Sequence, residues 1–114
     1  MDKYQIFISD PAFDDMDEIA LYISTQFHAP ETADDMLDAF HDAILSLEEM
    51  PKRYPLVRDD ILASLGYRMI PVKNYMIFYS VDEPSPEIHE VNIERVLYSG
   101  RNWKHILNPD GSTK

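Results

Sequence analysis

The sequence predicts an α+β domain in which one strand and two amphipathic helices precede a meander of three antiparallel strands. Two helical apolar periods fill residues 10 to 50, and three runs rich in β-branched and aromatic residues follow Gly66. Successive strands joined by short turns pair antiparallel. We therefore expect a mainly antiparallel four-stranded sheet with the helix hairpin packed on one face. A chain of 114 residues suits a single domain spanning residues 1–114.

The N-terminal half supplies the first strand and both long helices. Residues 3 to 8 form a short aromatic and β-branched strand, and Asp10 and Pro11 then predict an N-cap and the first helical residue. A break at Pro30 separates the two helices, and Pro51 ends the second. The apolar positions that recur every three or four residues are Phe13, Met16, Ile19, Ala20, Ile23 and Phe27 in the first helix, and Ala33, Met36, Leu37, Phe40, Ile44 and Leu47 in the second.

The C-terminal half supplies the meander. Residues 51 to 65 read as a connection with one short helical turn near residues 61 to 65. Three strands are expected over residues 67–72, 75–81 and 88–98, with a turn around Pro84 and Pro86 between the last two. A short C-terminal helix is expected within residues 102–107, and residues 109–114 are expected to form a flexible tail.

The central strand carries apolar side chains on both of its faces. Tyr75, Ile77 and Tyr79 point to one face, whereas Met76 and Phe78 point to the other. The helix hairpin can cover only one of these faces. Because exposed apolar patches of several hundred Å² are uncommon, we expect a partner chain to cover the second face. The alternatives are a ligand or residues 102–114 folded back over it.

The charge is distributed unevenly along the chain. Residues 1 to 50 hold 13 Asp and Glu against one Lys, which gives −12, and residues 51 to 114 hold 8 against 9 Lys and Arg, which gives +1, so the net charge is −11. Binding to nucleic acid depends largely on Lys and Arg displacing counterions. The chain therefore has an acidic helical half and a nearly neutral sheet half.

Composition also narrows the location and the chemistry. The chain has no Cys, which excludes disulfides, a thiolate nucleophile and a Cys-based zinc site. It has no apolar run long enough for a membrane span, and we expect a cytoplasmic protein without cofactors. Asp34, Asp38 and Asp42 recur every four residues beside His41, and such oxygen ligands can hold a divalent cation. That spacing matches no metal-binding loop, and a solvated acidic ridge without metal is expected.

The sheet half carries a resemblance to a known family. The segments GYRMIPVKNYMIFYSVD and VNIERVLYSGRNW resemble the RelE/ParE superfamily of type II toxin-antitoxin toxins, as does MPKRYP in the connection after the second helix. The likeness runs from Tyr4 to about Trp103. The matching positions are Gly66, Tyr67, Arg68, Val72, Asn74, Tyr75, Ile77, Tyr79, Ile93, Val96, Tyr98, Gly100, Arg101 and Trp103.

The resemblance implies a plasmid-stabilisation type toxin held inactive by a cognate antitoxin, which wraps the open sheet face and binds operator DNA through its other half. RelE-like members cleave mRNA in the ribosomal A site, and ParE-like members poison DNA gyrase; the fold does not decide between them. We favour gyrase or another protein target. An mRNA endonuclease and a non-toxic antitoxin-binding module remain as alternatives, and whether the protein is an enzyme stays open.

The resemblance also assigns candidate site residues. For a RelE-like nuclease, Arg68, Tyr98 and Arg101 would be catalytic, since RNA cleavage needs proton transfer and cationic donors at phosphorus. The alternatives are that Arg68 pairs with a carboxylate such as Glu94 and that Tyr98 lies at the edge of the core. His105 is expected to be a surface histidine. The expected antitoxin contacts are Met76, Phe78, Arg95 and Trp103, with an ion pair as the alternative for Arg95.

Overall fold

A computed structural model describes residues 3–108 of the chain, so the tail expected at residues 109–114 lies outside the described residues. The elements are β1 (Gln5–Ile8), α1 (Asp10–Gln26), α2 (Pro30–Ser46), the 3-10 helix η1 (Pro51–Arg53), α3 (Asp60–Ser64), β2 (Arg68–Val72), β3 (Tyr75–Ser85), β4 (Ile88–Tyr98) and α4 (Trp103–Leu107). This order confirms the α+β class and the strand, hairpin and meander that the sequence predicts.

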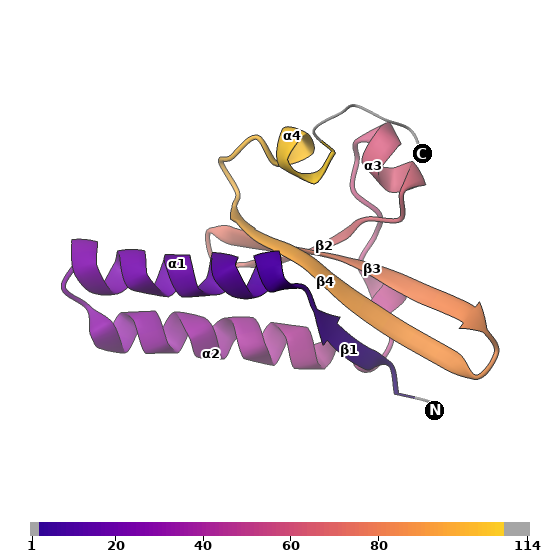
Figure 1. The fold of residues 1–114 in the computed structure, drawn as a ribbon, viewed down its shortest axis with the longest axis horizontal. Helices are drawn as coiled ribbons and strands as arrows, with labels where there is room; N and C mark the ends of the chain where they lie inside the picture. The colour runs from indigo at the N-terminus through magenta and orange to yellow at the C-terminus, as the bar shows by residue number, and fades with distance from the viewer. Residues whose placement is uncertain (1–2, 109–114) are drawn as a thin grey trace.

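The four strands form one sheet in the order β1-β4-β3-β2 (Figure 1). β1 runs parallel to β4, with Ile8 opposite Ile93, whereas β2, β3 and β4 are antiparallel neighbours. The sheet is therefore mainly antiparallel, as expected. β3 is longer than predicted because it passes through Pro84 and turns only after Ser85, which pairs with Ile88. The register shifts there, and proline is tolerated at such irregular strand positions.

The first helix begins one residue earlier than predicted. Ser9, not Asp10, is the N-cap, and its hydroxyl accepts a hydrogen bond from the Ala12 N–H at 3.1 Å. The same hydroxyl donates to the Glu94 carbonyl at 2.8 Å. Ser9 is the N-cap because its hydroxyl hydrogen-bonds both to a free N–H at the start of α1 and to a backbone carbonyl of β4. This double contact fixes where α1 leaves the sheet.

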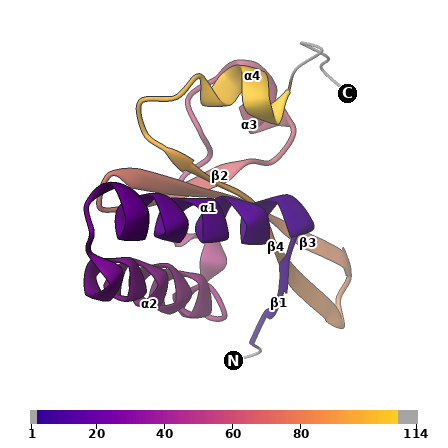
Figure 2. The same ribbon diagram turned by 60° about the vertical axis from the view of Figure 1, so that its left-hand side comes forward.

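α1 and α2 cover one face of the sheet, and both views place them together on that side (Figures 1 and 2). Phe40 of α2 is fully buried in this layer with Ile77 and Tyr79 of β3. The helices thus shelter the face that the sequence assigns to Tyr75, Ile77 and Tyr79. Ser9 and the helix hairpin together hold α1 beside β4.

The second face is covered by the chain itself, and so the expectation of an open face awaiting a partner is wrong. α3 and α4 lie on the side of the sheet opposite the two long helices (Figures 1 and 2). Phe78 and Leu97 are buried there with Val57 and Leu62, and the Trp103 ring lies 5.3 Å from the Phe78 ring. The alternative of a fold-back by the C-terminal segment is correct for α4. The rest of the cover comes from the segment before β2, which the sequence predicts to be only a connection.

Candidate protein-binding groove

A groove of about 590 Å³ lies between α1 and the C-terminal end of β4. The residues that line it are Asp15, Glu18, Ile19, Tyr22, Phe27, Asn74, Tyr75, Val96, Leu97, Tyr98 and Arg101. Three of them, Tyr22, Phe27 and Tyr98, are large aromatic residues that are at least half exposed. Aromatic side chains of this kind are typical of surfaces that bind proteins.

One face of α1 forms the first wall. Asp15, Glu18, Ile19 and Tyr22 follow one another at helical spacing and lie beside the stripe that packs into the core. The Tyr22 ring meets the Phe27 ring edge-on at 5.7 Å, just where the helix ends. The wall therefore begins with carboxylates and ends with two aromatic rings.

Two tyrosines of the sheet form the floor and the second wall. Tyr75 and Tyr98 are directly opposite each other on β3 and β4, with their rings 5.9 Å apart. The pKa of Tyr75 is raised, chiefly by burial and then by the nearby hydroxyls of Tyr22 and Tyr98. Within residues 3–108 none of these three hydroxyls makes a hydrogen bond. The groove therefore presents three phenol groups that can bind a ligand.

Gly100 fixes the position of the Tyr98 ring. A Cβ atom at this glycine would lie 2.7 Å from Tyr98 Cε2, closer than real Cβ contacts come. A side chain at this position would therefore force the Tyr98 ring to move.

The base of the groove is held by an ion pair between α1 and β4. Asp15 accepts from Arg95 Nε at 2.7 Å and from Arg95 Nη2 at 2.8 Å, and it also accepts from the Val96 N–H at 2.9 Å. This pairing raises the pKa of Arg95, mainly through the hydrogen bond to Asp15. It is a forked, charge-assisted contact. The β-bulge at Glu94, where β4 shifts register against β3, lies immediately before it.

The edge of β4 stays open beyond this ion pair. β1 pairs with β4 only as far as Ile93. The Val96 N–H points to Asp15, away from β3, while the Ser99 N–H donates to the Asn74 carbonyl in the turn just before β3. Because strand groups alternate with a period of two, the Val96 C=O and the Tyr98 N–H also point away from β3. Both therefore border the groove.

The structure brings together only two of the three predicted catalytic residues. Tyr98 and Arg101 line the groove. Arg68 lies on β2 opposite Tyr79, four residues along β3 from the position opposite Tyr98. At about 3.3 Å per residue that is roughly 13 Å along the sheet, before the distance across two strands is added. The three side chains do not surround one reacting group.

The guanidinium of Arg68 instead holds the connection after α2. It donates to the Tyr54 carbonyl at 2.6 Å and to the Lys52 carbonyl at 3.4 Å. Next to it the buried Tyr79 hydroxyl donates to the Pro51 carbonyl at 2.7 Å, and burial raises the pKa of Tyr79 to about 12. Arg68 therefore contacts backbone carbonyls and not Glu94.

The four predicted antitoxin contacts fall in two places. Met76, Phe78 and Trp103, the first residue of α4, belong to one cluster on the second face, where Phe78 is fully buried. Arg95 lies on the other side, paired with Asp15. The burial of Phe78 follows from the covered second face described above.

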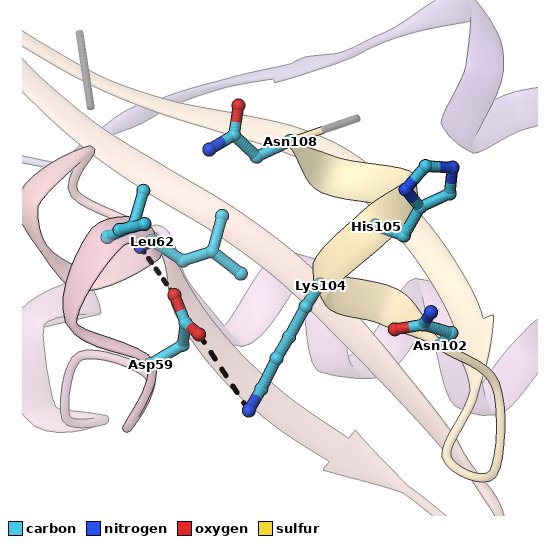
Figure 3. Close-up of a pocket in the computed structure, with 7 residues that line it drawn as sticks. Asp59, Leu62, Asn102, Lys104, His105 and Asn108 are labelled. Atoms are coloured by element: carbon cyan, nitrogen blue, oxygen red, sulfur yellow. Dashed lines mark hydrogen bonds and ion pairs between the residues drawn. The ribbon is translucent and has the colours of Figure 1, made fainter. Parts of the chain in front are cut away.

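A smaller hollow of about 300 Å³ lies between α3 and α4 (Figure 3). Asp59 caps α3 by accepting from the Leu62 N–H at 3.0 Å, and Lys104 of α4 reaches the same carboxylate at 3.7 Å. His105 is exposed at the rim of this hollow, as the surface interpretation predicts. This contact joins the two helices that cover the second face.

Sequence reasoning did not find most of the groove. Glu18, Tyr22 and Asn74 line it without a predicted role, and the sequence predicts catalysis, not protein binding, for Tyr98 and Arg101. A signal was present: Tyr22 is a large aromatic three residues after Ile19, outside the main apolar period. Nothing local in the sequence shows that β4 would end beside this face of α1.

Residues 3–108 contain neither a membrane-spanning helix nor a metal-binding cluster. No described helix combines the length and apolarity needed to cross a membrane. No group of three or more His, Asp or Glu side chains in this range could hold a metal ion. The Asp34, Asp38 and Asp42 side chains are all exposed.

Comparison with known proteins agrees with the fold and the sequence motifs. A chain of the chromosomal ParDE toxin-antitoxin system of P. aeruginosa aligns with a TM-score of 0.65 and 15% identity, covering 84% of this chain and 96% of that one. A chain of the RelBE2 toxin-antitoxin complex of Mycobacterium tuberculosis aligns with a TM-score of 0.54 and 22% identity, covering 84% and 98%. At these identities the likeness shows the fold alone. No curated protein matches the sequence.

The fold is that of the RelE/ParE toxins, as the resemblance implies. The family model of the ParE toxin of type II toxin-antitoxin systems (parDE) matches residues 6–103. The chain therefore belongs to this toxin family.

Proposed function

We propose that this toxin is neutralised by a cognate antitoxin and that it acts by binding a protein, with DNA gyrase as the first candidate, rather than by cutting RNA. The observation that carries the choice of target is the position of Arg68. Its guanidinium donates to backbone carbonyls of the connection after α2, and its strand position lies far from Tyr98 and Arg101.

Cleavage of RNA through the 2′-OH needs convergent groups. A proton acceptor, a proton donor and cationic hydrogen-bond donors must all reach one phosphate, each at about 3 Å. Tyr98 and Arg101 share the groove, but no His or carboxylate that could serve as a base joins them except Asp15 and Glu18. Asp15 is occupied by Arg95 and Val96. Glu18 is the one remaining candidate base, and we take a groove with so few convergent groups as support for binding over RNA cleavage.

Charge supports the same choice. α1 and α2 carry ten Asp and Glu and no Lys or Arg, and the net charge of the chain is −11. A surface of this kind repels the phosphates of ribosomal RNA and mRNA. It does not hinder contact with a protein that offers basic or apolar groups.

The antitoxin part of the proposal is supported by the family and by the groove. Both aligned structures are toxin-antitoxin complexes, and the aromatic groove beside α1 is a surface on which a second protein can dock. Within residues 3–108, the second face of the sheet is covered by α3 and α4.

A direct test separates the two targets. The toxin is induced briefly in cells, ribosome-bound mRNA is mapped by primer extension, and the purified toxin is added to a gyrase supercoiling assay. We expect intact mRNA and inhibited supercoiling. Codon-spaced cuts that disappear in Arg101→Ala but persist in the exposed control Lys73→Ala would overturn the protein target and establish the nuclease.

The nuclease is the second candidate because Tyr98 and Arg101 lie in one groove. If induction leaves growth, mRNA and supercoiling unchanged, both toxic activities fail. A non-toxic antitoxin-binding module would then be the function, and binding to the product of the adjacent reading frame would show it.

A further inference from the structure

We propose that the groove beside α1 binds an extended, net positive segment of the antitoxin, with apolar side chains inserted between Tyr22, Tyr75 and Tyr98. This inference rests on the proposed neutralisation by an antitoxin. It adds the site on the toxin and the chemistry of the segment that the site accepts.

Charge complementarity sets the sign of the partner segment. Of the ten carboxylates on α1 and α2, only Asp15 has an ion-pair partner within residues 3–108. Glu18 stands exposed at the wall of the groove, and Asp14 lies one turn before it on the same helix. A segment that enters beside these carboxylates gains attraction from Lys or Arg and repulsion from Asp or Glu.

The opposite wall carries a single cation. Arg101 lines the groove, is exposed, and has no ion-pair partner among the described residues. A basic side chain toward Glu18 and a polar acceptor toward Arg101 would therefore fix the direction in which the segment crosses the groove. Opposite charges on two walls give specificity as well as affinity.

The tyrosines supply the anchoring contacts. Tyr22 and Tyr98 are 55% and 50% exposed, and the Tyr75 ring lies between them at the floor. Rigid aromatic side chains of this kind often dominate binding energy at protein interfaces. Their hydroxyls, which make no hydrogen bond within the described residues, can bond to the backbone of an inserted segment.

The open edge of β4 favours an extended conformation. The Val96 C=O and the Tyr98 N–H point into the groove from a strand that has no neighbour there. An extended segment can satisfy both groups, whereas a helix has no free backbone groups along its side.

The test measures the affinity of the full-length toxin for the product of the adjacent reading frame by isothermal titration calorimetry. Two groove variants are paired with neighbours on α1 that point elsewhere: Tyr22→Ala with the exposed Leu21→Ala, and Glu18→Lys with the exposed Asp17→Lys. All four positions are on the surface, and circular dichroism confirms that each variant is folded.

We expect Tyr22→Ala to raise Kd about tenfold or more, while Leu21→Ala changes it less than about twofold. Glu18→Lys should raise Kd more than Asp17→Lys, and the gap should shrink between about 0.05 M and about 0.5 M NaCl. Equal Kd values for groove and control variants would show that the groove is not the antitoxin-binding site, while leaving the antitoxin proposal intact. If the affinity instead rises with salt concentration, the bound segment is not net positive. A wild-type toxin that does not bind at all would overturn both proposals.

Discussion

Asp15 shows how one side chain can complete a fold and shape a surface. Its carboxylate is almost fully buried and accepts three hydrogen bonds, two from Arg95 and one from the Val96 N–H. The third bond occupies a backbone donor on the edge of β4, which would otherwise lie unpaired beside α1. Asp15 therefore sets the distance between the two walls of the groove.

We predict that Asp15→Ala lowers the free energy of unfolding by about 3 kcal/mol, because it leaves the Arg95 guanidinium and a backbone N–H without their partner. Urea denaturation followed by circular dichroism measures the change. The exposed neighbour Asp14 provides the control, and Asp14→Ala should stay within about 0.5 kcal/mol of the wild type. Equal stabilities for the two variants would show that the ion pair contributes nothing.

At this scale the sequence predicts residue types better than residue roles. Arg68, Arg95 and Arg101 were all singled out, yet their roles depend on what lies opposite them in space. Arg95 meets Asp15 across 80 positions of the chain, and Arg68 meets carbonyls of the loop that follows α2. No local pattern encodes such pairings, which depend on the tertiary fold.

Among the elements, the β3–β4 hairpin is tied to the rest of the molecule by one acidic side chain near its turn. Glu83 bonds to the hydroxyl of Tyr4, lies 2.6 Å from Lys52 Nζ and 3.2 Å from His89 Nδ1. These contacts lower the pKa of Glu83 from its ordinary value of 4.5 to about 2, with the hydrogen bond to Lys52 the largest cause. The cluster joins β3 to the start of the chain and to η1.

We predict that Glu83→Gln removes a pH-dependent part of the stability. A carboxylate with a lowered pKa in the folded state stabilises the fold fully above the unfolded value and loses that contribution as the pH falls through the folded value. The Tm of the wild type should therefore exceed that of the variant at pH 7, and the difference should fall between pH 4.5 and about 2. A gap that is constant over this range would contradict the assignment.

The α4 helix is the element that decides which surface is open. Its Trp103 ring packs on Phe78, and Lys104 reaches Asp59 of α3 (Figure 3). We predict that Trp103→Ala destabilises the fold by about 2 kcal/mol, less than a fully buried Trp because this side chain is only partly buried. The variant should also bind the dye ANS, since Phe78 and Leu97 lose their cover.

The exposed residue two positions on provides the matched change in the same helix. His105→Ala should alter neither the stability nor the dye signal. If the two variants behave alike, α4 does not shelter the second face in solution.

The elements themselves could be largely predicted from the sequence. Helical and strand periods are local, and they located both long helices, the meander and the short C-terminal helix. The cover of the second face was not predicted, because Val57 and Leu62 lie in a stretch with two prolines and no extended period. Apolar residues in such a connection contribute to a core only when the tertiary fold brings them to it.

For the whole molecule, the main physical feature is the separation of charge between the two halves. α1 and α2 carry ten Asp and Glu and no Lys or Arg, whereas residues 51 to 114 have a net charge of +1. Like charges confined to one layer repel one another in the folded state. The same layer attracts a basic partner. The negative charge of the helices therefore lowers the stability of the fold and raises the affinity for such a partner.

Salt should therefore act on the two processes in opposite directions. Raising NaCl from about 0.05 M to about 0.5 M shortens the screening length from over 10 Å to roughly 4 Å. The repulsion among the acidic residues on α1 and α2 weakens, and we predict that the Tm of the free toxin rises by a few degrees, which calorimetry can measure. The affinity for the antitoxin should fall over the same range, because the attraction between the acidic wall and a positive segment is screened as well. Sodium sulfate at matched ionic strength controls for ion-specific effects, which differ between the two anions. If stability and affinity move together with ionic strength in both salts, charge on the helix layer does not govern the two processes.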